Sequence, residues 1–335
     1  MATLRAPVVI IAAALVLSGC GGKRTDDTTT PADQTGEASC ESTDGRITIA
    51  TGNATGVYFA LGGGLAQVIS NNTELKATAA ETGASVQNIE QLVKGDFDVA
   101  FSLADTAADA VEGKGAFEGK PAKVQALTNL YPNYTHVIVR ADAGISSVAD
   151  MRGKRISTGS PKSGTEVIAH RILQSAGVDP VRDIQTQRLD LTKTVDGMKD
   201  GSIDGMFWSG GLPTGGITDL TTSLKDRIAF VDVTPQLEKM QDINPVYAQG
   251  AIPATAYNLA DGDVPTIVVP NVLLVRDDFP AGSACAITKA IYDKKSDLEK
   301  VHAAARDIDL TKATDTGPVE LHSGAKKAIV DLGGR

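Results

Sequence analysis

The sequence predicts an α/β protein that is built as two lobes. Short runs rich in β-branched residues alternate along the chain with amphipathic runs of helical length, and this alternation favours largely parallel sheets. Two loops of small residues have the same construction, one in each half of the chain. Two similar strands, HVIVRAD at 136–142 and LLVRDD at 273–278, bound a central block. The matched strands indicate one domain inserted into another.

The N-terminus predicts export and lipidation. Arg5 precedes an apolar run at 8–17, which is too short to cross a bilayer, since a spanning helix needs about 20 residues. It suits the hydrophobic region of an export signal. Leu17-Ser18-Gly19-Cys20 then resembles a lipobox, in which cleavage precedes a lipidated cysteine. The alternative is an ordinary signal peptide followed by an unrelated cysteine.

We therefore expect a signal peptide at 1–20 and a chain that lies outside the cell membrane, anchored only by lipid on Cys20. Residues 21–45 have almost no apolar bulk and cannot offset their ordering entropy, so they predict a flexible tether. The folded body would begin at 46.

The first lobe is expected at 46–134 together with 278–335. Its predicted strands are 46–51, 75–81, 99–103 and 124–130, and its predicted helices are 57–70, 84–93, one from Ala104, 286–301 and 324–330. The helix at 84–93 is the clearest, because Val86, Ile89, Leu92 and Val93 fall on one face.

The second lobe is expected at 135–277. It holds strands at 136–140, 155–158 and 266–276, a helical turn at 148–152 and a helix at 164–176 that ends at Gly177. The alternation continues through 184–189, 195–199, 203–208 and 228–231.

Composition and motifs exclude several classes of function. The formal net charge is −9 and the chain has no basic stripe, which argues against nucleic acid as a partner. No Walker loop, dinucleotide fingerprint, nucleophile elbow or HExxH motif occurs, and the four histidines have no metal-ligand spacing. We expect no enzyme activity, cofactor or metal.

The cysteines left after lipidation of Cys20 are Cys40 and Cys285. Thiols outside the membrane tend to pair, so we predict a disulfide between them. Two separate thiols are the alternative.

The strongest local feature is the loop TGNATGVY at 51–58. It follows a strand and opens a helix, and Gly52 and Gly56 permit close backbone approach. The helix start presents unpaired N–H groups and a partial positive charge, which suits an anion. A plain strand–helix turn is the alternative.

The loop GSPKSGTE at 159–166 repeats this construction in the second block. Ser163 is placed to cap the helix, with Glu166 completing a capping box in a structural role. Gly164 and Thr165 would then offer backbone N–H groups and a hydroxyl to a carboxylate.

A third loop, FWSGGLP at 207–213, contains the only tryptophan. Trp208 either packs in the core or faces the ligand, and Tyr58 either covers the ligand or packs its own helix. Asp105 follows a strand and either meets the ligand or caps its helix. The residues expected to contact ligand are Gly52, Asn53, Thr55, Gly56, Val57, Tyr58, Asp105, Ser160, Ser163, Gly164, Thr165, Trp208, Ser209 and Gly210.

In this order the motifs resemble those of TAXI-type solute receptors of tripartite ATP-independent periplasmic (TRAP) transporters. The resemblance rests on IATG with GVY and LG at 49–62, GDFD at 95–98, GSPKSGTE at 159–166, Phe207 with GG and Pro213, DVP at 263–265 and LHSGA at 321–325. It implies a type II periplasmic-binding-protein fold, with two lobes joined by two crossing strands and a ligand in the cleft.

The resemblance also implies a function. The chain would be a monomer that captures a small carboxylate similar to glutamate, glutamine or 2-oxoglutarate and delivers it to an ion-driven TRAP permease. A lipoprotein of this fold that senses ligand without transport is the alternative. Relatives often have Tyr-Tyr at 58–59 and Gln-Ser-Asp at 103–105, where this chain has Tyr-Phe and Leu-Ala-Asp, so the ligand itself does not carry over.

Overall fold

A computed structural model describes residues 39–334 of the chain. The predicted signal peptide, the lipidation site at Cys20 and most of the predicted tether lie outside these residues. Within them, no helix is both long and apolar enough to cross a membrane. The first strand begins at Gly45, one residue before the body was expected to start.

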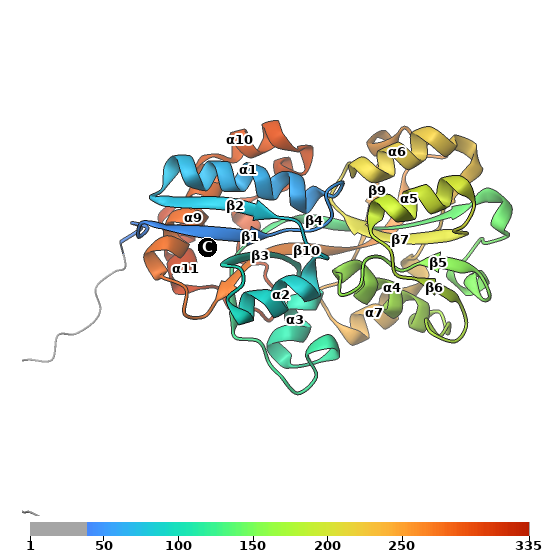
Figure 1. Cartoon of the computed structure of the whole chain (residues 1–335), viewed down its shortest axis with the longest axis horizontal. Coiled ribbons are helices and arrows are strands. Elements are labelled where there is room, and N and C mark those ends of the chain that lie inside the picture. Colours follow the sequence, from blue (N-terminus) through green and yellow to red (C-terminus); the bar gives the residue numbers. More distant parts are fainter. Residues whose placement is uncertain (1–38, 335) are drawn as a thin grey trace, which may run out of the picture. The chain divides into compact units, whose positions relative to one another are not determined.

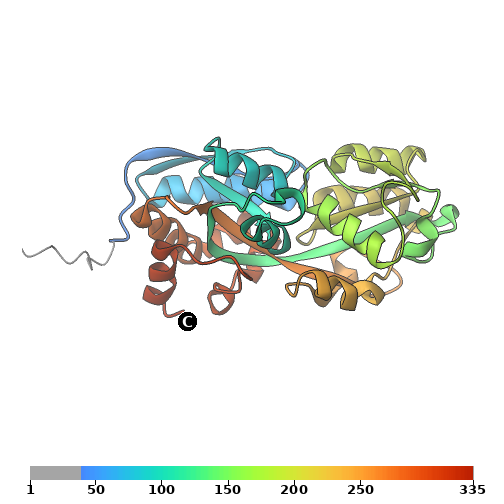
Figure 2. The same cartoon turned by 90° about the horizontal axis from the view of Figure 1, so that it is seen from below.

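The described residues form one mixed sheet, flanked by helices (Figures 1 and 2). Its main path has the order β2-β1-β3-β10-β4-β7-β5-β6, with β8 paired to β4 and β9 paired to β10. The strands are β1 (Gly45–Ala50), β2 (Leu75–Ala80), β3 (Val99–Leu103), β4 (Val124–Arg140), β5 (Arg155–Ser157), β6 (Gln185–Gln187), β7 (Gly205–Gly210), β8 (Ile228–Phe230), β9 (Ala248–Ile252) and β10 (Val264–Arg276).

The expectation of largely parallel sheets was wrong for the middle of this sheet. The pairs of β1 with β2 and β3, and of β5 with β6 and β7, are parallel. The long strands β4 and β10 instead run antiparallel to each other, β10 runs antiparallel to β3, and β4 runs antiparallel to β7. These two strands connect the outer parallel groups.

The separate strands expected at 124–130 and 136–140 are one continuous strand, β4. Pro132 lies between the two expected strands, and a proline cannot donate to a strand ladder. In the structure Pro132 is opposite Pro270, so neither partner requires an N–H from the other. Pairing of β4 with β7 begins only at Tyr134, and pairing of β10 with β9 ends at Val268. Neither proline is therefore paired with the strand on its other side, β7 for Pro132 and β9 for Pro270, so no hydrogen bond to those strands needs its missing N–H.

Helices cover both faces of the sheet (Figure 1). We call β1–β3, α1–α3 and α9–α11 lobe 1, and β5–β9 with α4–α8 lobe 2; β4 and β10 run through both. The helices are α1 (Val57–Asn72), α2 (Ser85–Lys94), α3 (Ala104–Glu112), α4 (Gly164–Ser175), α5 (Leu191–Asp200), α6 (Gly215–Leu224), α7 (Leu237–Ile243), α8 (Ala254–Tyr257), α9 (Ala281–Asp293), α10 (Lys295–Val301) and α11 (Ser323–Asp331).

Two helix predictions needed correction. The long helix expected at 286–301 is two helices, α9 and α10, separated at Lys294. Helix α9 packs against both α11 and α1, whereas α10 packs against α1 and the turn at 303–307, so the two segments share only one neighbour. In α2, Val86, Ile89 and Leu92 are buried as predicted, but Val93 is 45% exposed. The face of α2 that packs against β3 is therefore formed by Val86, Ile89 and Leu92, and Val93 lies outside it.

Two close contacts fasten the C-terminal helices. A Cβ on Gly324 would lie 2.0 Å from the carbonyl oxygen of Ala281, so only glycine lets α11 approach the start of α9. The ring of His322 caps α11, because its Nδ1 accepts the N–H of Gly324 at 3.2 Å. Cys40 is joined to Cys285 of α9, with Cα atoms 4.9 Å apart, which ties the N-terminal segment to this helix.

Candidate ligand-binding pocket

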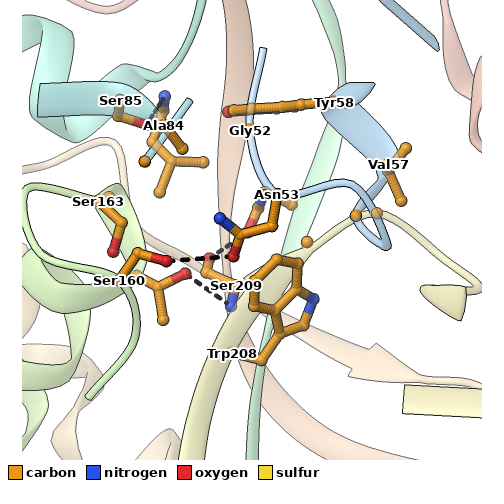
Figure 3. Close-up of a pocket in the computed structure, with 18 residues that line it drawn as sticks. Gly52, Asn53, Val57, Tyr58, Ala84, Ser85, Ser160, Ser163, Trp208 and Ser209 are labelled. Carbon is orange, nitrogen blue, oxygen red and sulfur yellow. Dashed lines mark hydrogen bonds between the residues drawn. The ribbon is translucent and has the colours of Figure 1, made fainter. Parts of the chain in front are cut away.

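A pocket lies where loops from both lobes meet, with an empty volume of about 450 Å³ that includes space open to solvent. Its walls come from the β1–α1, β2–α2, β5–α4 and β7–α6 loops and from the long strand β4 (Figure 3). The lining residues are Gly52, Asn53, Gly56, Val57, Tyr58, Gly83, Ala84, Ser85, Leu103, Asn133, Ser160, Ser163, Gly164, Thr165, Trp208, Ser209, Gly210 and Gly211. All the predicted contact residues except Thr55 and Asp105 are among them.

Three helices begin at this pocket. Helix α1 starts after Gly56, α2 starts after Ala84 and α4 starts after Ser163. The first N–H groups of a helix have no acceptor inside the helix and carry a partial positive charge. Among the described residues no side chain caps α1 or α2. The N–H of Gln87 in α2 donates to the carbonyl of Lys162, and the other first-turn donors of the two helices are available to a ligand.

The hydroxyls of Ser163 and Thr165 are prepared to donate. Ser163 Oγ accepts the N–H of Glu166 at 3.0 Å, and Thr165 Oγ1 accepts the N–H of Ser209 at 3.2 Å. A hydroxyl oxygen that already accepts a backbone N–H keeps its own O–H for a further acceptor. Both side chains are at least nine-tenths buried. Helix α4 therefore adds two hydroxyl donors to its backbone donors.

No residue that lines the pocket, among those the structure describes, has a carboxylic acid or a basic side chain. Lys162, the one cation in the predicted loops, is directed away from it: its Nζ lies 2.8 Å from Glu90 Oε2 on α2. Glu166 has the structural role expected of it, although its carboxylate accepts from the N–H of Lys162 at 2.9 Å and from Arg188, not from Ser163. Neutral donors and apolar surfaces are what remain for a ligand.

Thr55 and Asp105, which were expected to contact ligand, do not line this pocket. Thr55 is exposed, with its Oγ1 3.5 Å from Thr192 Oγ1, because the loop turns its side chain outward before Gly56. Asp105 is fully buried in the first turn of α3, where its carboxylate accepts hydrogen bonds from Arg171 and Tyr247. Burial raises the pKa of Asp105, and the guanidinium of Arg171 opposes that rise.

The sequence reasoning missed Gly83, Ala84, Ser85, Leu103, Asn133 and Gly211. The first three had a usable signal, since ETGAS at 81–85 is another small-residue loop between a strand and a helix. Asn133 had none, because it fell between the strands expected at 124–130 and 136–140.

Asn133 belongs to a buried amide cluster on the crossing strands. Its Nδ2 donates to Asn271 Oδ1 at 3.1 Å, and its Oδ1 accepts from Ser209 Oγ. Asn271 Oδ1 also accepts the hydroxyl of Tyr58 at 2.6 Å. Burial raises the pKa of Tyr58 well above its usual range, so the phenol stays protonated and donates. The cluster joins α1, β4, β10 and β7 behind the pocket.

The lobes touch across the pocket (Figure 3). Asn53 Oδ1 accepts from Ser160 Oγ and from the N–H of Leu191, each at 3.2 Å. The N–H of Gln87 in the first turn of α2 donates to the carbonyl of Lys162 at 3.0 Å. Lobe 2 thus donates to Asn53 of lobe 1 on one side of the pocket and accepts from Gln87 of lobe 1 on the other, so hydrogen bonds join the two lobes across it.

A family model described as NMT1-like matches residues 49–333, nearly all of the described chain. The chain belongs to the NMT1-like family. This NMT1-like chain also resembles solved structures. One is a binding-protein component of an ABC phosphonate transporter from Pseudomonas aeruginosa, with 12% identity, 79% of this chain and 80% of that chain covered, and a TM-score of 0.53.

A structure titled as a periplasmic transporter matches the NMT1-like chain with 14% identity over 86% of this chain and 93% of that one, at a TM-score of 0.52. A protein from Bordetella bronchiseptica RB50 matches with 17% identity over 85% and 88%, at a TM-score of 0.50. At these identities the likeness establishes the fold: two lobes of the type II periplasmic-binding-protein architecture, as the sequence predicted.

Proposed function

We propose that this NMT1-like chain is an extracytoplasmic receptor that captures a small anionic solute between its lobes for delivery to a membrane transporter. The observation that supports this most directly is the meeting of three helix starts at one pocket without a charged side chain in its lining. Helix N-termini bind anions through backbone N–H groups and their partial charge.

Closure supports a receptor as well. A ligand that contacts both lobes stabilises only the closed form, because those paired contacts exist only there. The donors of α1 and α2 belong to lobe 1 and those of α4 belong to lobe 2. A permease can then distinguish the loaded receptor from the empty one by its shape. In our proposal the lobes are 46–134 with 278–335, and 135–277, except that the end of β10 at 271–274 pairs with β3 of lobe 1.

A small carboxylate is the ligand class that we favour, delivered to a TRAP permease by a monomer anchored through Cys20. The resemblance to TAXI receptors supports the carrier, and the donors support the anion. A structural neighbour is a component of an ABC phosphonate transporter, so phosphonates are the second class to test. We propose no catalytic step, and ligand released by denaturation should be chemically unchanged.

A thermal-shift screen of the exported chain tests the ligand class. A ligand at 100 times its Kd adds about 2.7 kcal/mol to the unfolding free energy. At about 2–4 °C per kcal/mol this raises Tm by roughly 5–10 °C. We expect a shift from glutamate, 2-oxoglutarate, other dicarboxylates or phosphonates, and none from sugars or polyamines. A sugar or polyamine that stabilises the protein while every anion fails would refute the proposal.

Lipid anchoring has its own test, which uses Cys20→Ser. The substituted chain should leave the membrane fraction or remain uncleaved. If its size and membrane retention match those of the unchanged protein, Cys20 is not the anchor.

A further inference from the structure

The sole tryptophan of the chain forms the wall of the pocket in lobe 2. Trp208 is on β7 and is 9% exposed. Its six-membered ring reaches across to lobe 1: a Cβ on Gly56, the residue before α1, would lie 3.2 Å from Trp208 Cη2. The indole edge therefore closes the pocket against the start of α1 (Figure 3).

A threonine holds this indole in place. Trp208 Nε1 donates to Thr214 Oγ1 at 3.1 Å, and the same hydroxyl donates to the carbonyl of Gly211 at 2.8 Å. Thr214 stands at the N-cap of α6, where a threonine ordinarily accepts an N–H of its own helix. Here it makes no such cap bond. The Thr214 hydroxyl thus accepts a hydrogen bond from the indole of Trp208 and none from an N–H of α6.

A second layer holds the threonine. The N–H of Thr214 donates to the hydroxyl of Tyr257 at 2.9 Å, and this hydroxyl lies 2.9 Å from His136 Nε2. His136 Nδ1 lies 3.0 Å from the carbonyl of Tyr134. A carbonyl only accepts, so Nδ1 has the proton, Nε2 accepts, and Tyr257 must donate to it. Thr214 and His136 have no exposed surface, and Tyr257 is 5% exposed.

Gly210 makes room for the arrangement. A Cβ at this position would lie 2.5 Å from Trp208 Nε1 and 2.9 Å from Thr214 Oγ1, and so would fall between the donor and its acceptor. Any larger residue would force the indole and the threonine apart.

We propose that Thr214, Tyr257 and His136 are positioning residues of the binding site, which fix the indole of Trp208 as the wall that meets Gly56. The proposal rests on the proposed function only in that the wall encloses a ligand. When only a fraction of the molecules has the binding-competent arrangement, the apparent affinity for the ligand is reduced by that fraction. An indole that is already fixed before the ligand binds avoids this loss of affinity.

The test follows the single indole N–H resonance by nitrogen-15 NMR on the exported chain without ligand. One tryptophan gives one indole signal. In Thr214→Val the acceptor is lost while the shape is kept, so the signal should move and its hydrogen exchange should become roughly threefold to tenfold faster. Thr214→Ser keeps the hydroxyl and should restore slow exchange. Tyr257→Phe should give an intermediate rate.

Tyr292→Phe is the matched control, because it also removes a tyrosine hydroxyl bonded to a threonine: the hydroxyl of half-buried Tyr292 is bonded to Thr128 on β4. It should leave the indole signal unchanged. Wild-type exchange in both Thr214→Val and Tyr257→Phe, or an equal change in Tyr292→Phe, would overturn the proposal. Because no ligand is used, this test can succeed even if the anion screen fails, and the two failures are distinguishable.

Discussion

Thr165 faces two ways at the pocket. Its Oγ1 accepts the N–H of Ser209 at 3.2 Å, which links α4 to β7, and its own O–H is left to donate. Thr165 is also the second residue of α4, so its backbone N–H is among the free donors of the helix start. Under the proposed function, the backbone and the side chain of this one residue would both donate to the same anion.

Thr165→Ala should weaken anion binding about tenfold to a hundredfold. A hydrogen bond to a charged acceptor contributes roughly 1.5–3 kcal/mol, and about 1.4 kcal/mol corresponds to a factor of ten. Thr165→Ser is the matched control and should bind almost as the unchanged protein does. Titration calorimetry with the carboxylate found by the screen measures both.

Lys162→Ala should have a smaller effect. The side chain does not simply point to solvent, since it pairs with Glu90 across the cleft, but this ion pair is more than half exposed on the lysine side. Exposed pairs contribute about 0.2–1 kcal/mol, which limits the loss to a few-fold. A crippled Lys162→Ala beside a near-native Thr165→Ala would mean that a side-chain charge holds the anion.

His136 couples the stability of lobe 2 to pH. Burial lowers its pKa to about 4, against an ordinary value near 6.5. Below about pH 6.5 His136 is protonated in the unfolded chain but stays neutral in the folded chain. The contribution of His136 to the unfolding free energy is therefore complete above about pH 6.5 and is lost as the pH falls toward 4.

Between pH 7 and pH 4.5 the unfolding free energy should fall by roughly 2–3 kcal/mol because of His136. His170, His302 and His322 also have lowered pKa values and act in the same direction. The comparison is therefore made with His136→Gln, by urea unfolding at both pH values. Equal losses in the two proteins would show that His136 does not titrate in this way.

At the scale of elements, an ion-pair cluster joins α3 of lobe 1 to α4 of lobe 2. Arg171 on α4 donates to Asp109 Oδ1 at 2.8 Å and to Asp105 Oδ2 at 3.2 Å, both on α3. Tyr247, just before β9, donates to Asp105 and accepts from Arg171 at 2.9 Å. Burial works against the charge on Arg171, but Tyr247 and the two carboxylates raise its pKa overall.

Arg171→Met should destabilise the fold by about 3–5 kcal/mol, because it leaves two buried carboxylates without their counter-charge. The control is Arg182→Met, which breaks the exposed pair with Asp179 and should cost under about 1 kcal/mol. Urea unfolding of both variants decides the matter. Similar small effects would mean that the cluster is as well solvated as a surface pair.

At the scale of the whole molecule, the Cys40–Cys285 bridge spans 245 residues of sequence. A cross-link over so long a loop restricts the unfolded chain, and removal of a native disulfide typically costs 2–5 kcal/mol. The bond also holds the segment that enters β1 against α9. Its loss should therefore be felt first at the edge of lobe 1.

Reductant should lower the Tm of the exported chain and leave the Tm of Cys40→Ser, which begins lower, unchanged. Non-reducing mass spectrometry should find the two cysteine peptides linked. Recovery of both thiols in alkylated form from untreated protein would contradict the bridge.

Local sequence determined much of this protein. The alternation of strands and helices, the small-residue loops at 51–58 and 159–166 and the start of α4 after Ser163 were all predictable, because a helix start needs only its own few residues. Most residues that line the pocket were also predictable, since the backbone donors of a strand–helix loop do not depend on distant side chains. The family resemblance supplied the order of these motifs and the two-lobed fold.

Tertiary structure decided where individual polar side chains point. Asp105 follows a strand as a ligand residue would, yet Arg171, 66 positions away, draws it into a buried ion pair. Asn133 fell between two expected strands, but 124–140 is one continuous strand in which Pro132 lies opposite Pro270. The indole of Trp208 donates to Thr214, which is bonded to Tyr257, which in turn is bonded to His136, and these residues lie far apart in the sequence. Hydrogen bonds and ion pairs form between whichever groups packing brings within about 3 Å, and that depends on how distant segments meet.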